Sequence, residues 1–273
     1  MIKKIIHCAD LHIRPYLRLN EYAEQFEAFV EKCREIAEPY EKDEVRILIS
    51  GDICHSKINV SNELFTVASY LIRRLEEIAP VIVIAGNHDM IAENSSRTDT
   101  LTGLFNTAGF TNSKYLDMML DYQSGCVVDD NVVWALYSIM DDFRRPDIGA
   151  VERDDDTRVI GLYHGMVVGA TLNNGSVVAD GLDSDAFEGC DCVMAGHVHK
   201  KQELKRGDAI ILYPGSLIQQ TFGETVSQHG FAVWDVKDMT YEYVELPTEY
   251  GLYDIEIESI EDIDNDKERL VNF

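Results

Sequence analysis

Aspartate, histidine and asparagine residues gather in five short segments of this 273-residue chain. The segments are Asp10-Leu11-His12, Gly51-Asp52-Ile53-Cys54-His55, Gly86-Asn87-His88-Asp89, His164-Gly165 and Gly196-His197-Val198-His199. Mixed imidazole and carboxylate ligands suit Mn, Fe or Zn better than Mg or Ca. The number of these groups fits two ions, and a carboxylate such as Asp52 can bridge two cations about 3.5–4 Å apart. The segments therefore predict a centre of two divalent metal ions.

The spacing inside two of the segments supports this prediction. Asp10 and His12 are two residues apart, and so are His197 and His199. In an extended chain, residues two apart face the same way, so each pair can present two ligands to one small volume. Asn87 offers a neutral oxygen, which holds a cation without adding negative charge where an anionic substrate must bind.

The first part of the chain alternates between apolar runs and amphipathic segments. Strands are predicted at 2–8, 45–50 and 81–85, and helices at 20–38 and 62–79. Asn20 and Ser61 are the expected N-caps of the two helices. This alternation is typical of a parallel sheet with helices packed on it.

Six further strands are predicted later in the chain. They lie at 131–138, 158–163, 191–195, 209–213, 230–236 and 240–246. The last of them follow one another closely, which indicates an antiparallel extension or a second sheet. Because ligands of open α/β sheets bind beyond the carboxyl ends of the strands, we expect all five polar segments at strand ends of one sheet.

The composition is that of an acidic globular protein, with a net charge of −25, 45% hydrophobic and 27% charged residues. Bulk attraction to nucleic acid is excluded, so a polyanionic substrate needs a local basic patch or bound cations. No apolar run spans a bilayer, and the apolar run at the N-terminus is too short for a signal peptide. The six cysteines form no C-x-x-C pair, which favours reduced thiols. We expect a cytoplasmic protein without membrane contact, in the host cytoplasm if it is phage-encoded.

The ordered motifs D-x-H, G-D, G-N-H-D, H and G-H-x-H resemble those of the calcineurin-like metallophosphoesterase superfamily. Finer details are similar to the SbcD-type nuclease subunit of the SbcCD double-strand-break repair complex, a group that includes phage recombination nucleases. These details are His55 three residues after Asp52, a third motif ending in Asp89, and the later stretches 213–216, 222–223 and 230–236. The resemblance implies an α/β fold, a four-layer α/β/β/α sandwich of two mixed sheets flanked by helices.

The resemblance also assigns roles to the residues of the five segments. One metal would be held by Asp10, His12, Asp52 and His199, and the other by Asp52, Asn87, His164 and His197. Mn²⁺ is the ion that we expect at both positions. The implied catalytic residues are His88, which would stabilise the transition state or protonate the leaving oxygen, and His55, which would lie near the substrate phosphate.

The implied activity is that of a two-metal DNA nuclease, an exonuclease or endonuclease, in DNA recombination and repair or phage DNA processing. The resemblance adds an SbcC-type ATPase subunit as a partner and a homodimer formed through residues 20–38 or 62–79. One alternative is a cyclic-nucleotide or small-molecule phosphodiesterase, which the acidity favours and His55 and the stretch 213–216 oppose. The other is a non-catalytic metal-bound scaffold, which the complete set of ligands opposes.

Two basic groups flank the outer polar segments. Arg14 and Arg18 follow the first segment, and Lys200 and Lys201 follow the last, so these four are the expected contacts to DNA backbone phosphates.

We predict a nuclease domain at residues 1–246. Residues 247–273 would be an acidic linker or the start of a truncated capping domain. The segment that grips the ATPase in this family would then be missing, which puts that partner in question.

Overall fold

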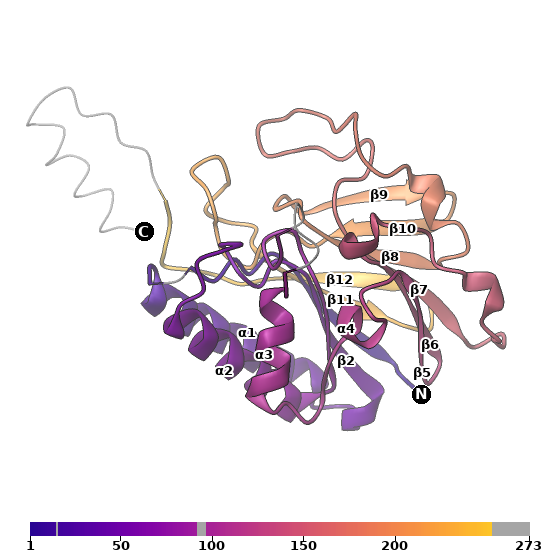
Figure 1. Ribbon diagram of the computed structural model, residues 1–273, viewed down its shortest axis with the longest axis horizontal. Coiled ribbons are helices and arrows are strands. Elements are labelled where there is room, and N and C mark those ends of the chain that lie inside the picture. Colours follow the sequence, from indigo (N-terminus) through magenta and orange to yellow (C-terminus); the bar gives the residue numbers. More distant parts are fainter. Residues whose placement is uncertain (15, 92–96, 253–273) are drawn as a thin grey trace, which may run out of the picture.

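The computed structural model describes residues 1–14, 16–91 and 97–252, and these residues form two mixed six-stranded sheets (Figure 1). The first sheet has the order β12-β11-β1-β2-β3-β4, and the second β5-β6-β7-β8-β10-β9. The strands of the first sheet, in that order, are Thr240–Glu245, Gly230–Asp235, Lys4–Cys8, Val45–Ser50, Val81–Ile84 and Ser113–Tyr115. Those of the second are Gly125–Asp129, Val132–Tyr137, Arg158–His164, Cys192–Gly196, Ala209–Tyr213 and Gln202–Arg206.

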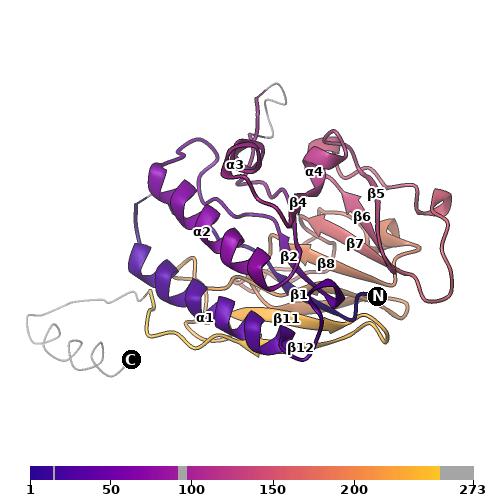
Figure 2. The ribbon, with the colours of Figure 1, turned by 90° about the horizontal axis from the view of Figure 1, so that it is seen from below.

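Three helices cover the outer face of the first sheet, as Figures 1 and 2 show. They are α1 (Leu19–Ala37), α2 (Asn62–Ile78) and α3 (Thr100–Ala108), and a single turn, α4 (Leu116–Met119), follows β4. The apolar stripes of α1 and α2 pack on Ile47 and Ile49 of β2 in one hydrophobic cluster. No described helix is both long and apolar enough to cross a membrane.

The two sheets pack on each other through a second hydrophobic cluster. Leu48 of β2 points away from the helices and lies in this cluster with Trp134 and Leu162 of the second sheet. Central strands of the first sheet are therefore buried on both faces, which is why they appear in the sequence as largely apolar runs. The outer face of the second sheet packs against short 3-10 helices and loops, with Ile148 and Phe187 in a third cluster.

The expected α/β architecture of two mixed sheets flanked by helices is confirmed. The expectation that all five polar segments follow strands of one sheet is wrong. Strands β1, β2 and β3 belong to the first sheet, whereas β7 and β8 belong to the second. Both options for the late strands occur, since β11 and β12 extend the first sheet antiparallel to β1 while β8 and β10 build the second.

The predicted N-cap is confirmed for α2 and wrong for α1. The Ser61 side chain accepts a hydrogen bond from the Leu64 amide and caps α2, as predicted. For α1 the cap is Arg18, in the left-handed region at φ 62°, and Asn20 lies inside the helix. All six cysteines fall in the described part of the chain and are free thiols, as expected.

The predicted boundary at residue 246 stays a prediction. Strand β12 ends at Glu245, and the next residues contact α1, where Gln25 donates to the Pro247 carbonyl. Most of the segment 247–273, from residue 253 onward, lies outside the described residues.

Candidate metal centre

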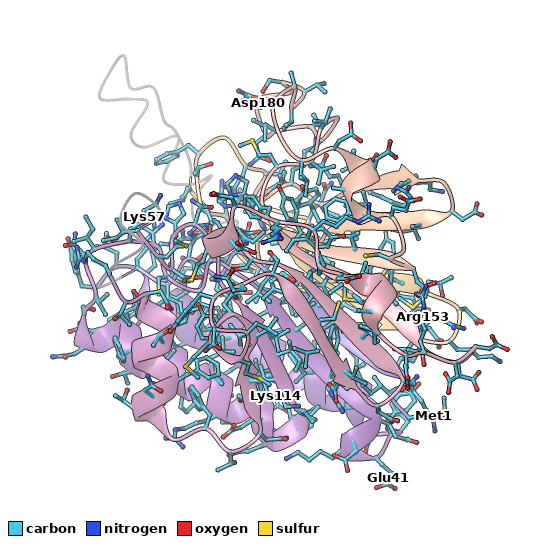
Figure 3. All side chains as sticks on the ribbon, turned by 45° about the vertical axis from the view of Figure 1, so that its right-hand side comes forward. Met1, Glu41, Lys57, Lys114, Arg153 and Asp180 are labelled. Carbon is cyan, nitrogen blue, oxygen red and sulfur yellow. The ribbon has the colours of Figure 1, made fainter. Side chains whose placement is uncertain are left out.

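The five polar segments meet at one edge of the molecule, beyond the carboxyl ends of β1, β2, β3, β7 and β8. Parallel pairing brings these ends together within each sheet, and a backbone bridge joins Ala9 to Ser216. In Figure 3 the labelled Lys57 and Asp180, in the loops after β2 and β7, lie toward this edge, and Met1 and Glu41 lie at the opposite one. The protein therefore has a polar site in the seam between its two sheets.

One group of candidate ligands consists of Asp10, His12 and His199. Their ligand atoms all lie within 4.8 Å of one another, and Nε2 of His12 is 2.9 Å from Nε2 of His199. Nδ1 of His199 donates to a carboxylate oxygen of Glu224 at 2.9 Å, which turns Nε2 of the ring toward the group.

A second group consists of Asp52, His164 and His197, whose ligand atoms also lie within 4.8 Å of one another. Nδ1 of His164 donates to the Ser50 carbonyl oxygen at 2.7 Å, and its buried Nε2 has no hydrogen-bond partner among the described residues. Nδ1 of His197 lies 2.7 Å from Oδ1 of Asn87, so the predicted amide ligand joins this group.

The Asp52 carboxylate lies between the two groups. Its Oδ2 is 3.4 Å from Nε2 of His12 in the first group and 3.3 Å from Nε2 of His164 in the second. Its Oδ1 accepts a hydrogen bond from the His88 amide at 2.7 Å. This is the position that a carboxylate bridging two cations would occupy.

The ligand pairs converge for a different reason than the spacing indicated. Asp10, His12 and Asp52 have left-handed backbones with φ of 55°, 45° and 54°, and His197 has φ 95°. The segments are therefore not extended, and the expectation that strand alternation aligns their ligands is wrong. Such conformations cost about 1–3 kcal/mol each and persist where the surrounding fold imposes them, often at functional sites.

Two buried carboxylates in this centre have only histidines as cationic neighbours. Within the described residues, no lysine or arginine approaches Asp10 or Asp52 to ion-pair distance. Burial raises the pKa of Asp10 to about 6. Burial also opposes ionisation of Asp52, but His164 and His12 outweigh it and hold the pKa of Asp52 below its usual value.

The histidines respond to the same charges. Burial alone would lower the pKa of His164, but the adjacent Asp52 carboxylate raises it to about 9. Burial and the neighbouring His164 lower the pKa of His197 to about 4. The centre thus joins two buried carboxylates to several imidazole rings, with no described lysine or arginine at ion-pair distance from those carboxylates. This set of nitrogen and oxygen donors suits Mn, Fe or Zn. The residues therefore fit two divalent cations.

His88 lies beside the first group, with its ring centroid 4.8 Å from that of His12. Its Nδ1 donates to the His55 carbonyl oxygen at 2.6 Å, which fixes the ring and leaves Nε2 as the atom for a substrate. His55 accepts at Nε2 from the Arg14 guanidinium at 2.8 Å, and burial together with Arg14 lowers its pKa to about 4. A third group of candidate ligands consists of His12, His55 and His88, whose ligand atoms also lie within 4.8 Å of one another.

The other basic residues differ in how they are engaged. Arg18 forms a nearly buried ion pair with Glu21 through Nε and Nη2, and its role as a phosphate contact stays a prediction. Lys200 and Lys201 are exposed next to His199, and Nζ of Lys201 lies 3.9 Å from the centre of the Tyr243 ring.

Sequence reasoning missed Glu224, which carries the hydrogen bond to His199. It lies in the loop between β10 and β11, where no periodic pattern or motif spacing marks it. Asp89 is fully buried and accepts hydrogen bonds from the amides of Cys54 and Gly86, which ties together the segments that carry Asp52 and Asn87.

Gly86 is required by its close approach to Asp52, because a Cβ there would collide with the backbone nitrogen and Oδ1 of Asp52. We expect Gly86→Ala to displace the carboxylate and weaken Mn²⁺ binding by about tenfold or more, as changes behind a metal ligand do. A Mn²⁺ titration of the metal-free protein measures this. Gly103→Ala in α3 is the matched control, since its Cβ would meet only Phe65, at 3.9 Å. Equal affinities in the two variants would contradict the close approach.

Comparison with known proteins agrees with these observations. The family model for the calcineurin-like phosphoesterase superfamily domain matches residues 3–239. An uncharacterized protein of Acanthamoeba polyphaga mimivirus is 32% identical over 270 residues, covering 94% of this chain and 19% of that protein. The SbcD subunit of nuclease SbcCD from Staphylococcus saprophyticus is 25% identical over 262 residues, covering 86% of this chain and 66% of that protein. The chain thus spans about a fifth and about two thirds of the length of these relatives.

Solved structures of low sequence identity also match. One is described as a novel archaeal phosphodiesterase, with 14% identity, a TM-score of 0.45 and coverage of 89% of this chain and 99% of that one. Another is Vps29 of Entamoeba histolytica with zinc, with 12% identity, a TM-score of 0.36 and coverage of 89% and 99%. The match of the family model over most of the chain is decisive, and the chain belongs to the calcineurin-like phosphoesterase superfamily.

Proposed function

We propose that this protein is a two-metal phosphodiesterase that cleaves DNA, in recombination and repair or in phage DNA processing. The observation that carries the proposal is the Asp52 carboxylate between two ligand groups, with His88 held beside it. Similarity to an SbcD subunit over 86% of the chain supports DNA as the substrate.

The ligand groups define which residues would hold each ion. Asp10, His12, Asp52 and His199 would hold one, and Asp52, Asn87, His164 and His197 the other. When bound, two divalent cations neutralise the non-bridging oxygens of a phosphate and lower the pKa of a water. In this acidic protein they would also offset the repulsion of a polyanionic substrate.

His88 is the residue that we assign to the leaving group. Hydrolysis forms a bond from a water oxygen to phosphorus and breaks the bond from phosphorus to a sugar oxygen, which then takes up a proton. The hydrogen bond from Nδ1 to the His55 carbonyl orients the ring, so that Nε2 of the doubly protonated ring would deliver this proton. The proton that the attacking water loses would pass to solvent and restore the balance. The Arg14 guanidinium, held by His55 and the Gln220 carbonyl, would bind a phosphate oxygen at the edge of the centre.

The DNA backbone would continue past the centre toward Lys200 and Lys201, the exposed cations beside His199. Two aromatic side chains on the surrounding loops are exposed, Tyr16 at 71% and Phe222 at 64%, and would stack on unpaired bases. Arg18, which is paired with Glu21, stays a predicted contact to the backbone on the other side of the centre.

An SbcC-type ATPase subunit is the proposed partner, and similarity to the SbcD subunit is its support. A homodimer also stays a prediction. Near the predicted helical regions, large apolar side chains are exposed mainly in the preceding loops, at Tyr16, Leu17, Ile58 and Val60.

The test is an assay of the purified protein with Mn²⁺ on end-labelled linear DNA and, separately, on a small phosphodiester. Shortened DNA products that disappear with EDTA would support the nuclease assignment, and the product ladder would give the polarity. Hydrolysis of the small ester alone would favour the small-molecule phosphodiesterase. Mn²⁺ binding without turnover of either substrate would favour the scaffold.

A further inference from the structure

We propose that Glu224 is a positioning residue, which holds His199 in its metal-binding orientation and thereby sets the affinity of one of the two ion sites. The inference rests on the two-cation centre of the proposed function and not on DNA as the substrate. It concerns the site formed by Asp10, His12 and His199.

The contact between Glu224 and His199 determines which nitrogen of the ring can bind a metal. Oε1 of Glu224 accepts the Nδ1 proton of His199 at 2.9 Å, so the lone pair is on Nε2. That nitrogen lies 2.9 Å from Nε2 of His12, inside the ligand group. A metal-binding histidine usually donates its other ring N–H to a carboxylate or a carbonyl, which fixes the tautomer and raises the basicity of the ligand.

Glu224 is itself held rigidly in the loop between β10 and β11. Its side chain is 2% exposed, and Oε2 accepts from the Gln220 amide at 2.9 Å and from the Ser216 hydroxyl at 3.3 Å. Oε1 also accepts from the Thr221 hydroxyl at 3.2 Å. These donors fix the orientation of the carboxylate, and the fixed carboxylate in turn orients the His199 ring.

The two ion sites differ in this respect. In the second group His164 donates to a neutral acceptor, the Ser50 carbonyl, whereas His199 in the first donates to a carboxylate. The negative charge of Glu224 strengthens only His199 as a ligand. Loss of that charge should therefore weaken one site and leave the other unchanged.

The experiment is a Mn²⁺ titration of the metal-free, full-length chain by calorimetry, with wild type, Glu224→Gln, Glu224→Ala and Glu203→Gln. Glu203 lies on β9, and its replacement removes an equal charge outside the ligand groups. We expect one of the two dissociation constants to rise about 10- to 100-fold in the Glu224 variants, the range found for partners of metal-binding histidines. The other constant, and both constants of the Glu203 variant, should stay at the wild-type value.

Electron paramagnetic resonance of Mn²⁺ supplies a signature that a merely structural role would not change. At two equivalents of Mn²⁺ the wild type should show the spectrum of two magnetically coupled Mn²⁺ ions. At the same concentration Glu224→Gln should show the spectrum of a single bound Mn²⁺ ion. Unchanged constants in Glu224→Gln, or equal weakening of both sites, would overturn the proposal. These measurements use no DNA. They would therefore test the role of Glu224 even if the protein proved not to be a nuclease.

Discussion

Replacing His88 by alanine is expected to slow DNA cleavage by about 10²- to 10⁴-fold, the usual contribution of a general acid or base. The reason is geometric. The centroid of the His88 ring lies 4.8 Å from that of the His12 ring. The hydrogen bond from Nδ1 of His88 to the His55 carbonyl leaves Nε2 for the substrate. Affinity for Mn²⁺ should not change, because His88 is not among the proposed ligands. Steady-state rates and a Mn²⁺ titration of the same variant measure both effects.

Two controls separate proton transfer by His88 from other roles. An ester with an acidic phenol as leaving group needs little protonation, so the defect of His88→Ala should be much smaller on that ester than on DNA. His88→Asn can keep the hydrogen bond to the His55 carbonyl, but its side chain has no group in place of Nε2 that could transfer a proton. It should therefore cleave DNA as slowly as His88→Ala. Wild-type cleavage by His88→Asn would show that the ring only supports the His55 loop. A loss of Mn²⁺ binding would make His88 a ligand.

The second large effect is expected for Asp52→Asn. This change should abolish binding of the two metal ions together and lower the turnover of DNA by at least about 10³-fold. Metal ions contribute several kcal/mol to the stabilisation of transition-state charge, and about 1.4 kcal/mol is a factor of ten in rate. Oδ2 of Asp52 lies within 3.4 Å of one histidine in each ligand group, so removal of its charge affects both sites. Asparagine keeps the size of the side chain and can still accept from the His88 amide.

The matched control for this variant is Asp183→Asn, which removes an equal charge from an exposed position ahead of a short 3-10 helix. It should bind two Mn²⁺ ions and turn over DNA like the wild type. If Asp52→Asn bound two ions with wild-type affinity, Asp52 would not be the bridging ligand.

The ligand segments could be predicted from the sequence because each one directly follows an apolar run. Runs such as 47–49 and Val81–Ile84 are buried on both faces, so they appear as apolar stretches that end abruptly in polar residues. The order of the sheets could not be predicted in this way. Buried parallel strands look alike in either sheet, and only long-range pairing assigns β7 and β8 to the second.

The missed elements have weak local signals. Strands β5 and β9 lie at the two edges of the second sheet and are partly exposed, so polar residues interrupt their apolar pattern. Helix α3 has only nine residues, and its N-cap, Asp99, could be recognised only after the helix was known. Glu224 was missed because its role depends on a contact with His199, 25 residues away in the sequence.

The central claim is that two cations lie on either side of Asp52, and X-ray diffraction from crystals soaked in Mn²⁺ tests it most directly. An anomalous difference map should show two peaks about 3.5–4 Å apart, one beside His12 and His199 and the other beside His164 and His197. A single peak, or no peak, would contradict the two-metal account. A peak among His12, His55 and His88, the third group of candidate ligands, would contradict the role assigned to His88.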